Sequence, residues 1–381
     1  MRSRRSLLAL AAVALLVAAG CGSSGSSGAS GSAGSTGTTS GSPGSTGSTA
    51  STASTASNGG TTLTLLTYDA FTEPDALKQF TKTTGIGVKV AKSGDAGTLV
   101  NKAILTAGRP EGDVLWGLDN TLLSRALDTN LFVPYASSAL SKLNPAATEL
   151  VPGHQVTPVD TGDVCLNFDK QWFADKGVKP PASLEDLTQP SYKGLTVVEN
   201  PSTSSPGLAF LLATVAHFGD PGYIDYWKAL RANDVLVDDS WDTAYDSSFT
   251  QGGGNGKRPI VVSYSTSPPA TIFYANDPKP KEPTTGSVDA SCFSQVEFAG
   301  ILRGTKHEAQ ARQLIDFLVG LPFQNELPLT NFVYPARTDA QLPDLFVNFA
   351  RPVPKPLTVS PADIAAHRDE WIKQWTDTVL R

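Results

Sequence analysis

The pattern of apolar and polar positions divides the chain near residue 61. Beyond that point, an alternating run over 63–68 that is rich in β-forming residues predicts a strand, and 73–80 predicts the start of a helix with Leu77 and Phe80 on its apolar face. Further strands are predicted over 87–91, 113–118, 164–168, 195–198, 260–264 and 295–299, and helices over 97–105, 121–127, 207–216, 223–233, 307–318 and 361–380. Because strands and helices alternate, we expect an α/β fold with mainly parallel sheets flanked by helices.

The first 21 residues have the pattern of an export signal. A positively charged segment over 1–5 precedes a short apolar core over 7–17, and small residues precede Cys21, as in a bacterial lipoprotein signal peptide. We expect Cys21 to be lipidated and to anchor the protein at the outer face of the cell membrane. The leucine usual three positions before the cysteine is replaced by Ala18, so an ordinary secretory signal, with a periplasmic product, is the alternative.

Residues 22–60 consist almost entirely of Gly, Ser, Thr and Ala, with no charged or aromatic side chain. Such a segment cannot bury enough apolar surface to offset its ordering entropy, so we expect a disordered linker. A flexible linker of about 39 residues spans roughly 35 Å, enough to let a folded body move above a membrane while it stays attached.

Charge and cysteine content narrow the function classes. The 381 residues include 30 Lys and Arg against 36 Asp and Glu, a net charge of −6, and the basic residues are scattered, which argues against a nucleic-acid partner.

Besides Cys21, the only cysteines in the sequence are Cys165 and Cys292. In an exported protein this pair is a candidate disulfide, with two buried free thiols as the alternative.

Patterns of catalytic or metal-binding residues are absent from the sequence. No G-x-S-x-G motif occurs, and the glycine-rich segment 252–257 lacks the flanking residues of a phosphate-binding loop, which indicates a surface turn. The four histidines have no metal-ligand spacing. We therefore expect no catalytic residue, no metal and no cofactor.

Hydroxyl, carboxyl and aromatic side chains gather where predicted strands end and helices begin. Tyr68 and Asp119 end strands, Asp95 and Ser204 open helices, and Trp241 precedes a short helix. In open α/β sheets ligands bind beyond the carboxyl ends of strands, and helix N-termini offer N–H donors to anions. Aromatic faces and carboxylates suit a flat cation. The sequence therefore predicts a site for a small molecule with an aromatic, positively charged part.

An ordered set of short motifs carries a family resemblance that runs from about residue 63 to 381. The set comprises L-T-Y-D at 66–69, G-L-D-N at 117–120, S-S-P-G at 204–207, V-S-Y-S-T-S-P at 262–268, Q-V-E at 295–297, F-Q-N at 323–325, V-Y-P at 333–335 and the tail at 358–375. In these motifs the chain resembles the thiamine-binding periplasmic proteins of bacterial ABC transporters. Iron-binding relatives carry a late Tyr-Tyr pair that is absent here.

The resemblance implies a two-lobed periplasmic binding protein of type II, with a hinge between the lobes. Lobe one would hold 61–164 and 299–381, and lobe two 165–298. A monomer of this kind would capture thiamine, or a thiamine phosphate, in the cleft and deliver it to the permease. In this fold the segments that cross between lobes run side by side, so Cys165 and Cys292 are expected to form a disulfide at the hinge, about 5–6 Å apart at Cα.

Carried over position by position, the resemblance also implies a set of ligand-binding residues. Direct contacts fall on Asp95, Ala96, Ser204, Ser205, Trp241, Tyr264, Ser265, Thr266 and Ser267, while Tyr68, Asp119 and Phe332 are expected to face the cleft. The chain departs from the family at Ala96, where a glycine is usual, and at Phe332, where a tryptophan is usual. The family's tyrosine after Ser-Pro is also missing, and Tyr274 lies one helical turn later.

Two alternatives stay open. A polyamine or another small cation could replace thiamine on the same fold. A secreted thiamine-degrading enzyme would also use this scaffold, but it would need an activated cysteine nucleophile, for which Cys165 and Cys292 are the sole candidates beyond Cys21.

Overall fold

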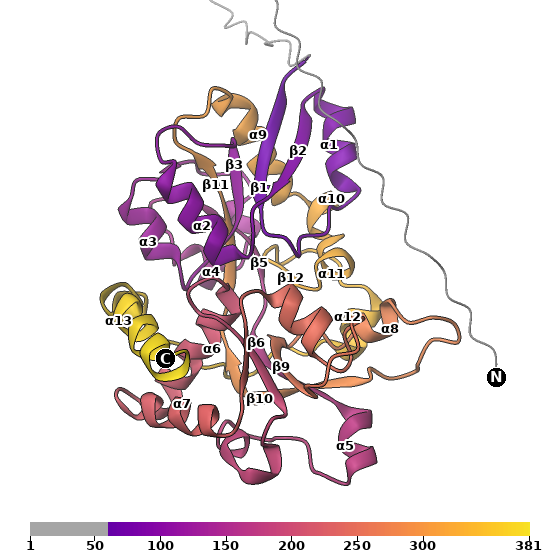
Figure 1. Cartoon of the computed structure of the whole chain (residues 1–381). Coiled ribbons are helices and arrows are strands. Elements are labelled where there is room, and N and C mark those ends of the chain that lie inside the picture. The colour runs from indigo at the N-terminus through magenta and orange to yellow at the C-terminus, as the bar shows by residue number, and fades with distance from the viewer. Residues whose placement is uncertain (1–59) are drawn as a thin grey trace, which may run out of the picture. The chain divides into compact units, whose positions relative to one another are not determined.

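The computed structural model describes residues 60–381, so the predicted signal peptide with Cys21, and linker residues 22–59, lie outside the described residues. Within 60–381 the strands form two separate β-sheets, one of seven strands and one of five, with helices packed around them (Figure 1). This arrangement is the expected two-lobed α/β fold. No helix in this part of the chain is both long enough and apolar enough to cross a membrane.

The first sheet has the order β12-β5-β11-β3-β1-β2, with β4 beside β11. Its strands are β1 (Thr62–Thr67), β2 (Gly87–Lys92), β3 (Val114–Asp119), β4 (Phe132–Val133), β5 (Thr157–Thr161), β11 (Val296–Leu302) and β12 (Tyr334–Pro335). Its helices are α1 (Ala76–Thr84), α2 (Ala96–Leu105), α3 (Leu123–Asp128), α4 (Pro145–Thr148), α9 (Glu308–Leu318), α10 (Leu321–Gln324), α11 (Leu327–Thr330) and α12 (Asp344–Phe349). Trp116 on β3 packs edge-on against Phe71 and Phe323 in the core of this lobe.

The second sheet has the order β10-β6-β9-β7-β8. Its strands are β6 (Val164–Asp169), β7 (Thr196–Glu199), β8 (Leu236–Asp238), β9 (Ile260–Tyr264) and β10 (Thr285–Phe293). Its helices are α5 (Lys170–Lys176), α6 (Ser205–Phe218), α7 (Gly222–Ala232) and α8 (Ala270–Phe273), together with the π-helical turn η4 (Thr243–Ser248). Helix α6 is buried over 205–215, as its continuous apolar sequence predicts.

The sheets are mixed, so the expectation of mainly parallel sheets is wrong. In the first sheet only β1–β2 and β1–β3 pair in parallel, while β11 runs antiparallel to β3, β4 and β5. In the second sheet β6 runs antiparallel to both β9 and β10. The cause is the direct crossing between sheets. β6 follows β5, and β11 follows β10, through short links from the other sheet. Each of them enters its sheet from the cleft side and so runs opposite to its neighbour β9 or β3, which ends at that side.

The division of the chain between the sheets differs from the expected lobe boundaries at three points. Val164 already belongs to β6 of the second sheet, and Val296 already belongs to β11 of the first. The last helix, α13 (Pro361–Val379), packs against α7 of the second sheet, where Trp375 meets Trp227 edge-on at 5.5 Å. The apolar stripe of this helix predicted that it would be buried, but not against which partner.

The two cysteines lie beside each other where the chain enters and leaves the second sheet. Cys165 is on β6 and Cys292 on β10, which are antiparallel neighbours. Their Cα atoms are 4.1 Å apart, closer than expected, and their sulfur atoms are at bonding distance. Both residues are four positions from the neighbouring strand of the first sheet, β5 or β11. The crossing segments therefore run side by side, as the resemblance implied.

Candidate functional site

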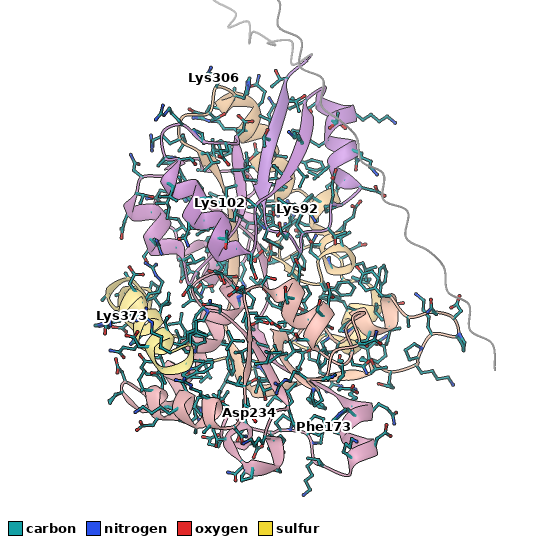
Figure 2. All side chains as sticks on the ribbon, viewed as in Figure 1. Lys92, Lys102, Phe173, Asp234, Lys306 and Lys373 are labelled. Carbon is teal, nitrogen blue, oxygen red and sulfur yellow. A yellow bond between two sulfur atoms is a disulfide. The ribbon has the colours of Figure 1, made fainter. Side chains whose placement is uncertain are left out.

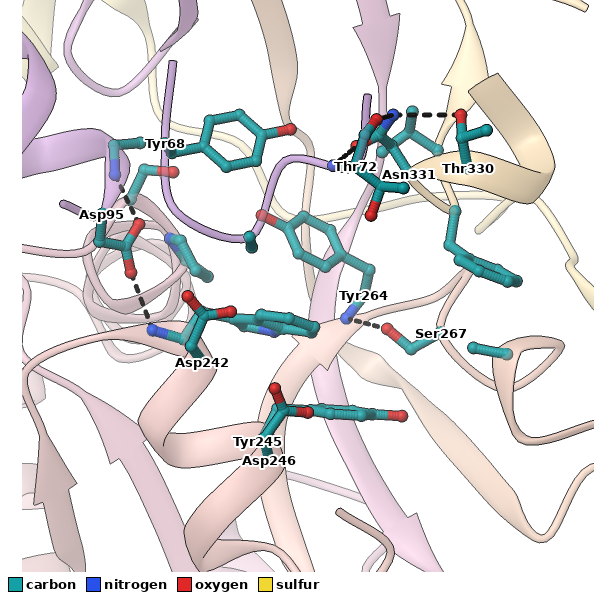
Figure 3. Close-up of a pocket in the computed structure, with 18 of the residues that line it drawn as sticks. Tyr68, Thr72, Asp95, Asp242, Tyr245, Asp246, Tyr264, Ser267, Thr330 and Asn331 are labelled. Carbon is teal, nitrogen blue, oxygen red and sulfur yellow. Dashed lines mark hydrogen bonds between the residues drawn. The ribbon is translucent and has the colours of Figure 1, made fainter. Parts of the chain in front are cut away.

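A pocket of about 350 Å³ is lined by residues of both sheets (Figure 3). Tyr68 and Asp95 come from the first sheet, at the ends of β1 and β2, whereas Trp241 and Tyr264 come from the second. Helices α2 and α6 both begin beside the pocket, because Ala96 and Ser205 are their first residues. The pocket thus lies beyond the strand ends, where open α/β sheets hold ligands.

Two stacked aromatic rings form one wall of the pocket. The rings of Trp241 and Tyr245 are 4.8 Å apart and inclined by only 17°. The indole Nε1 of Trp241 donates to Ser263 Oγ at 3.1 Å, which fixes the orientation of the ring. Tyr245 lies on η4, so it follows Trp241 by one helical turn. A stacked pair of this kind offers a flat electron-rich face to a planar or cationic ligand.

The position of the Tyr68 ring in the pocket depends on a glycine on the neighbouring strand β3. A Cβ added to Gly117 on β3 would lie 2.5 Å from Cδ1 of Tyr68, so only glycine leaves room for this ring. Gly117 also has φ +115°, a conformation that glycine adopts without strain. The Tyr68 hydroxyl donates to Glu297 Oε2 at 3.4 Å. Burial, and then the nearby Glu297 carboxylate, hold the pKa of Tyr68 well above its usual value.

Asp95 joins the two sheets at the edge of the pocket. Its Oδ1 accepts from the backbone N–H of Ala96 at 2.6 Å and begins α2, while its Oδ2 accepts from the backbone N–H of Trp241 at 2.8 Å. Burial raises the pKa of Asp95, and these hydrogen bonds oppose the rise. Close by, the N–H of Thr98 donates to the carbonyl of Thr203 at 3.1 Å. The Thr98 bond holds the N-terminal ends of α2 and α6 close together, and the Asp95 bond joins α2 to the segment that carries Trp241.

Acidic residues dominate the charge of the pocket. Four carboxyl groups line it, from Asp95, Asp242, Asp246 and Glu297, and no Lys, Arg or His is among the lining residues. Burial, and then Asp246, raise the pKa of Asp242 to about 6. Lys92 at the end of β2 (Figure 2) donates to the carbonyl of Asp69 and opposes this rise only weakly. The pocket is therefore suited to a cation rather than to an anion.

An aromatic cluster closes the other side. Phe332 lines the pocket, and its ring lies 5.7 Å from Phe273 and 5.6 Å from Tyr274. Because Phe332 follows α11 of the first lobe and the other two follow β9, these rings connect the lobes. Phe332 has φ 52°, which is unusual for a bulky residue and shows that its surroundings fix its position.

Most of the predicted binding residues line the pocket. They are Tyr68, Asp95, Ala96, Ser205, Trp241, Tyr264, Ser267 and Phe332.

Four predicted residues do not line the pocket. Asp119 is fully buried and accepts hydrogen bonds from Thr121, so it begins the turn before α3 instead of facing the cleft. Ser204 accepts from the N–H of Gly207 as the N-cap of α6. Ser265 and Thr266 form the turn after β9, and their side chains are buried.

Several lining residues were not predicted from the sequence. They include Thr72, Tyr245, Asp242, Asp246, Glu297 and Asn331. Tyr245 could have been found, since it follows Trp241 by four positions. Glu297 lies in the quoted Q-V-E motif, and a carboxyl within a buried strand is itself a signal of a site. Thr72 and Asn331 come from distant loops that only the fold brings together.

The described residues contain no group of three or more His, Cys, Asp or Glu side chains arranged to hold a metal ion. The pocket presents aromatic faces, hydroxyls and carboxyl groups.

Comparison with known proteins gives the family. The family of bacterial extracellular solute-binding proteins matches residues 112–348. The thiamine-binding periplasmic protein of Salmonella typhimurium is 31% identical over 328 residues, which is 84% of this chain and 94% of the relative, and that of Escherichia coli is 29% identical over the same shares. A solved periplasmic thiamin binding protein superposes with a TM-score of 0.73 at 28% identity, covering 84% of this chain and 96% of that one. The chain therefore belongs to the bacterial extracellular solute-binding proteins, and within them to the family of the thiamine-binding periplasmic proteins.

Proposed function

We propose that this protein captures thiamine in the pocket between its two sheets and delivers it to the permease of an ABC transporter. The observation that carries the proposal is the combination of three features of the pocket lining: the stacked Trp241–Tyr245 pair, four carboxyl groups, and no Lys, Arg or His side chain. Thiamine joins a flat pyrimidine to a permanently cationic thiazolium ring, which is the chemistry that such a pocket recognises. The relatives named as thiamine-binding proteins support the same ligand.

The unphosphorylated vitamin is the preferred ligand. A phosphate in the pocket would meet the N–H groups at the starts of α2 and α6 and the hydroxyls of Ser205 and Ser267, but no cationic side chain. It would also face carboxyl groups of Asp95 and Glu297. Neutral donors partly offset that repulsion. We therefore expect thiamine monophosphate to bind more weakly than thiamine, and thiamine diphosphate more weakly still.

The protein acts by capture and not by catalysis. Cys165 and Cys292 have their sulfur atoms at bonding distance, which supports a disulfide, and in a disulfide neither cysteine would be a free nucleophile. A thiamine-degrading enzyme would need such a nucleophile. We infer a cycle in which thiamine shifts the protein toward a closed arrangement that the permease recognises.

The cellular setting is inferred from the N-terminal sequence. We propose that the mature protein is a monomer, attached to the outer face of the cell membrane through lipidated Cys21 and the linker over 22–60. An exported, periplasmic location agrees with that of the named relatives.

Isothermal titration calorimetry with thiamine, its mono- and diphosphate, and spermidine tests the proposed ligand. We expect tight one-to-one binding of thiamine, weaker binding of the phosphates and none of spermidine, which lacks an aromatic ring. Mass spectrometry after incubation should recover thiamine unchanged. Spermidine binding in preference to thiamine, or cleavage products of thiamine, would contradict the proposal.

A further inference from the structure

Three carboxyl side chains lie in one row across the first sheet beneath the pocket. Glu297 on β11 is the register partner of Asp160 on β5 and of Asp119 on β3. Register partners on neighbouring strands carry their side chains on the same face of the sheet. The three residues are only 5%, 1% and 0% exposed, respectively. Like charges directly opposite one another are destabilising, so this row needs compensation for its charge.

Hydrogen bonds compensate the negative charge of the Asp119 carboxylate. Its Oδ1 accepts from the N–H and the hydroxyl of Thr121 at 3.0 and 2.6 Å and from the N–H of Leu122 at 3.2 Å. Its Oδ2 accepts from Nε2 of Gln295. A carboxylate with this many donors can keep its charge when buried.

Glu297 and Asp160 have far fewer donors. Asp160 Oδ2 accepts from Trp116 Nε1 at 3.0 Å, but Oδ1 has no hydrogen-bond partner within residues 60–381. Glu297 receives the long 3.4 Å bond from Tyr68 and otherwise faces the pocket. Within the row, these two carboxyl groups therefore lack enough hydrogen-bond donors to stabilise a negative charge on both of them.

The groups around this pair add no positive charge. Those that face it are Tyr68 at the end of β1, Asp95 at the start of α2, Asp119 on β3 and Tyr264 on β9. Burial raises the pKa of Asp160 to about 7. Burial, and then the neighbouring Asp160 and Asp119, raise the pKa of Glu297 well above its usual value.

We propose that Glu297 and Asp160 share one proton in the ligand-free protein and release it to the solvent when a cationic ligand occupies the pocket. The proposal rests on the proposed function in that the ligand carries a positive charge. A proton supplies the missing charge before binding, and the cation supplies it afterwards, because two close buried carboxyls cannot both ionise without a counter-charge. Glu297 is then a specificity-determining residue, since a neutral ligand cannot displace the proton.

The sign of the pH dependence follows from this exchange. Below the pKa of the pair, a proton must leave before the cation is fully accommodated, so affinity falls as the pH falls. Burial raises the pKa of Asp160 to about 7 and, together with the neighbouring carboxyls, raises the pKa of Glu297 well above its usual value. With release of one proton, affinity should rise with pH by up to about tenfold per pH unit below the pKa of the pair, and level off above it.

Calorimetry measures the released proton directly. Thiamine is titrated at about pH 6.5 into the mature protein in phosphate and in Tris, two buffers whose ionisation enthalpies differ strongly. The observed enthalpies should differ by the amount that corresponds to release of most of one proton. The thiophene analogue of thiamine, which has the same shape but no positive charge, should bind more weakly and release none.

Two variants assign the proton to its site. Glu297→Gln should weaken thiamine binding, remove the proton release and flatten the pH profile, while the exposed Glu282→Gln should behave as wild type. Thiamine binding with equal enthalpy in both buffers would overturn the inference and leave the proposed function intact. Absence of thiamine binding at every pH would contradict the proposed function itself. Should Glu297→Gln fail to fold, the buffer comparison on the wild-type protein still decides.

Discussion

The Asp95 carboxylate and the backbone N–H of Trp241 form a hydrogen bond of 2.8 Å that links α2 of the first lobe to the segment after β8 of the second. The same carboxylate begins α2 through Ala96. One side chain therefore fixes a helix terminus, the position of the aromatic wall and the contact between the lobes. A ligand that needs this wall also needs the contact, so we expect binding and lobe closure to be coupled.

Asp95→Asn tests this coupling. Asparagine can still begin α2, but it offers an amide N–H₂ group where Trp241 requires an acceptor. A hydrogen bond to a charged group contributes about 1.5–3 kcal/mol, so thiamine affinity should fall about tenfold or more, with little change in melting temperature. Calorimetry and thermal unfolding measure the two effects. Asp69→Asn, a change at a neighbouring acid that makes no bond across the lobes, is the matched control, and equal losses in both variants would contradict the link.

Gly97→Ala should hinder closure by a steric clash. A Cβ at Gly97 would lie 2.5 Å from the carbonyl oxygen of Thr203, an atom of the other lobe. Overpacking of this kind costs about 1–3 kcal/mol, and it arises only when the lobes are together, so affinity should fall roughly five- to 150-fold. Small-angle scattering with saturating thiamine should show a larger radius of gyration than for wild type. Gly253→Ala, where a Cβ meets open space, should change neither quantity.

Trp241→Ala should weaken thiamine binding through loss of the stacked wall. The change removes the ring that stacks on Tyr245 and the bond to Ser263. We expect a loss of about 1–3 kcal/mol in binding free energy, and a smaller loss for Trp241→Phe, which keeps a ring face. Calorimetric dissociation constants rank the variants. A dissociation constant for Trp241→Ala equal to that of wild type would exclude this residue from the site.

Reduction should lower the melting temperature of the protein more than its affinity for thiamine. A bond between Cys165 and Cys292 closes a loop with a sequence separation of 127 residues and ties β6 to β10 within one lobe, and neither cysteine lines the pocket. The chain-entropy relation gives about 5 kcal/mol for such a loop. Thiol titration of the unreduced, denatured Cys21→Ser variant should find no free cysteine. Two free thiols in that sample would refute the pairing.

Cys21→Ser should move the protein from the membrane fraction to the soluble exported fraction. Loss of the lipid chain removes the hydrophobic anchor, whereas the folded body, residues 61–381, is unaffected. Fractionation and immunoblotting measure the distribution, with Cys292→Ser as a control that should stay with the membrane. Retention of the Cys21→Ser protein on the membrane would show that the anchor lies elsewhere.

Local patterns of apolar residues were enough to predict seven strands and the main helices, whereas β5 and β10 were not predicted. Strand β1 and helix α6 are local consequences of alternation and of a continuous apolar run, and both occur where predicted. Residues near predicted strand ends, such as Tyr68 and Asp95, could be placed at the site from the sequence, because ligands bind beyond strand ends in this class of fold. The motif order gave the family, although each motif alone is short.

Contacts between residues that are far apart in sequence could be learned from the three-dimensional fold alone. The sheets became mixed because β11 returns from the second lobe and inserts beside β3, a pairing between residues far apart in sequence. That insertion places Glu297 between Asp119 and Asp160, and the Glu297 carboxyl lines the pocket. Asp119 instead accepts hydrogen bonds from the turn before α3. Local patterns report local backbone preference and burial. The charge around a side chain is set by neighbours from other strands, and no window of the sequence contains them.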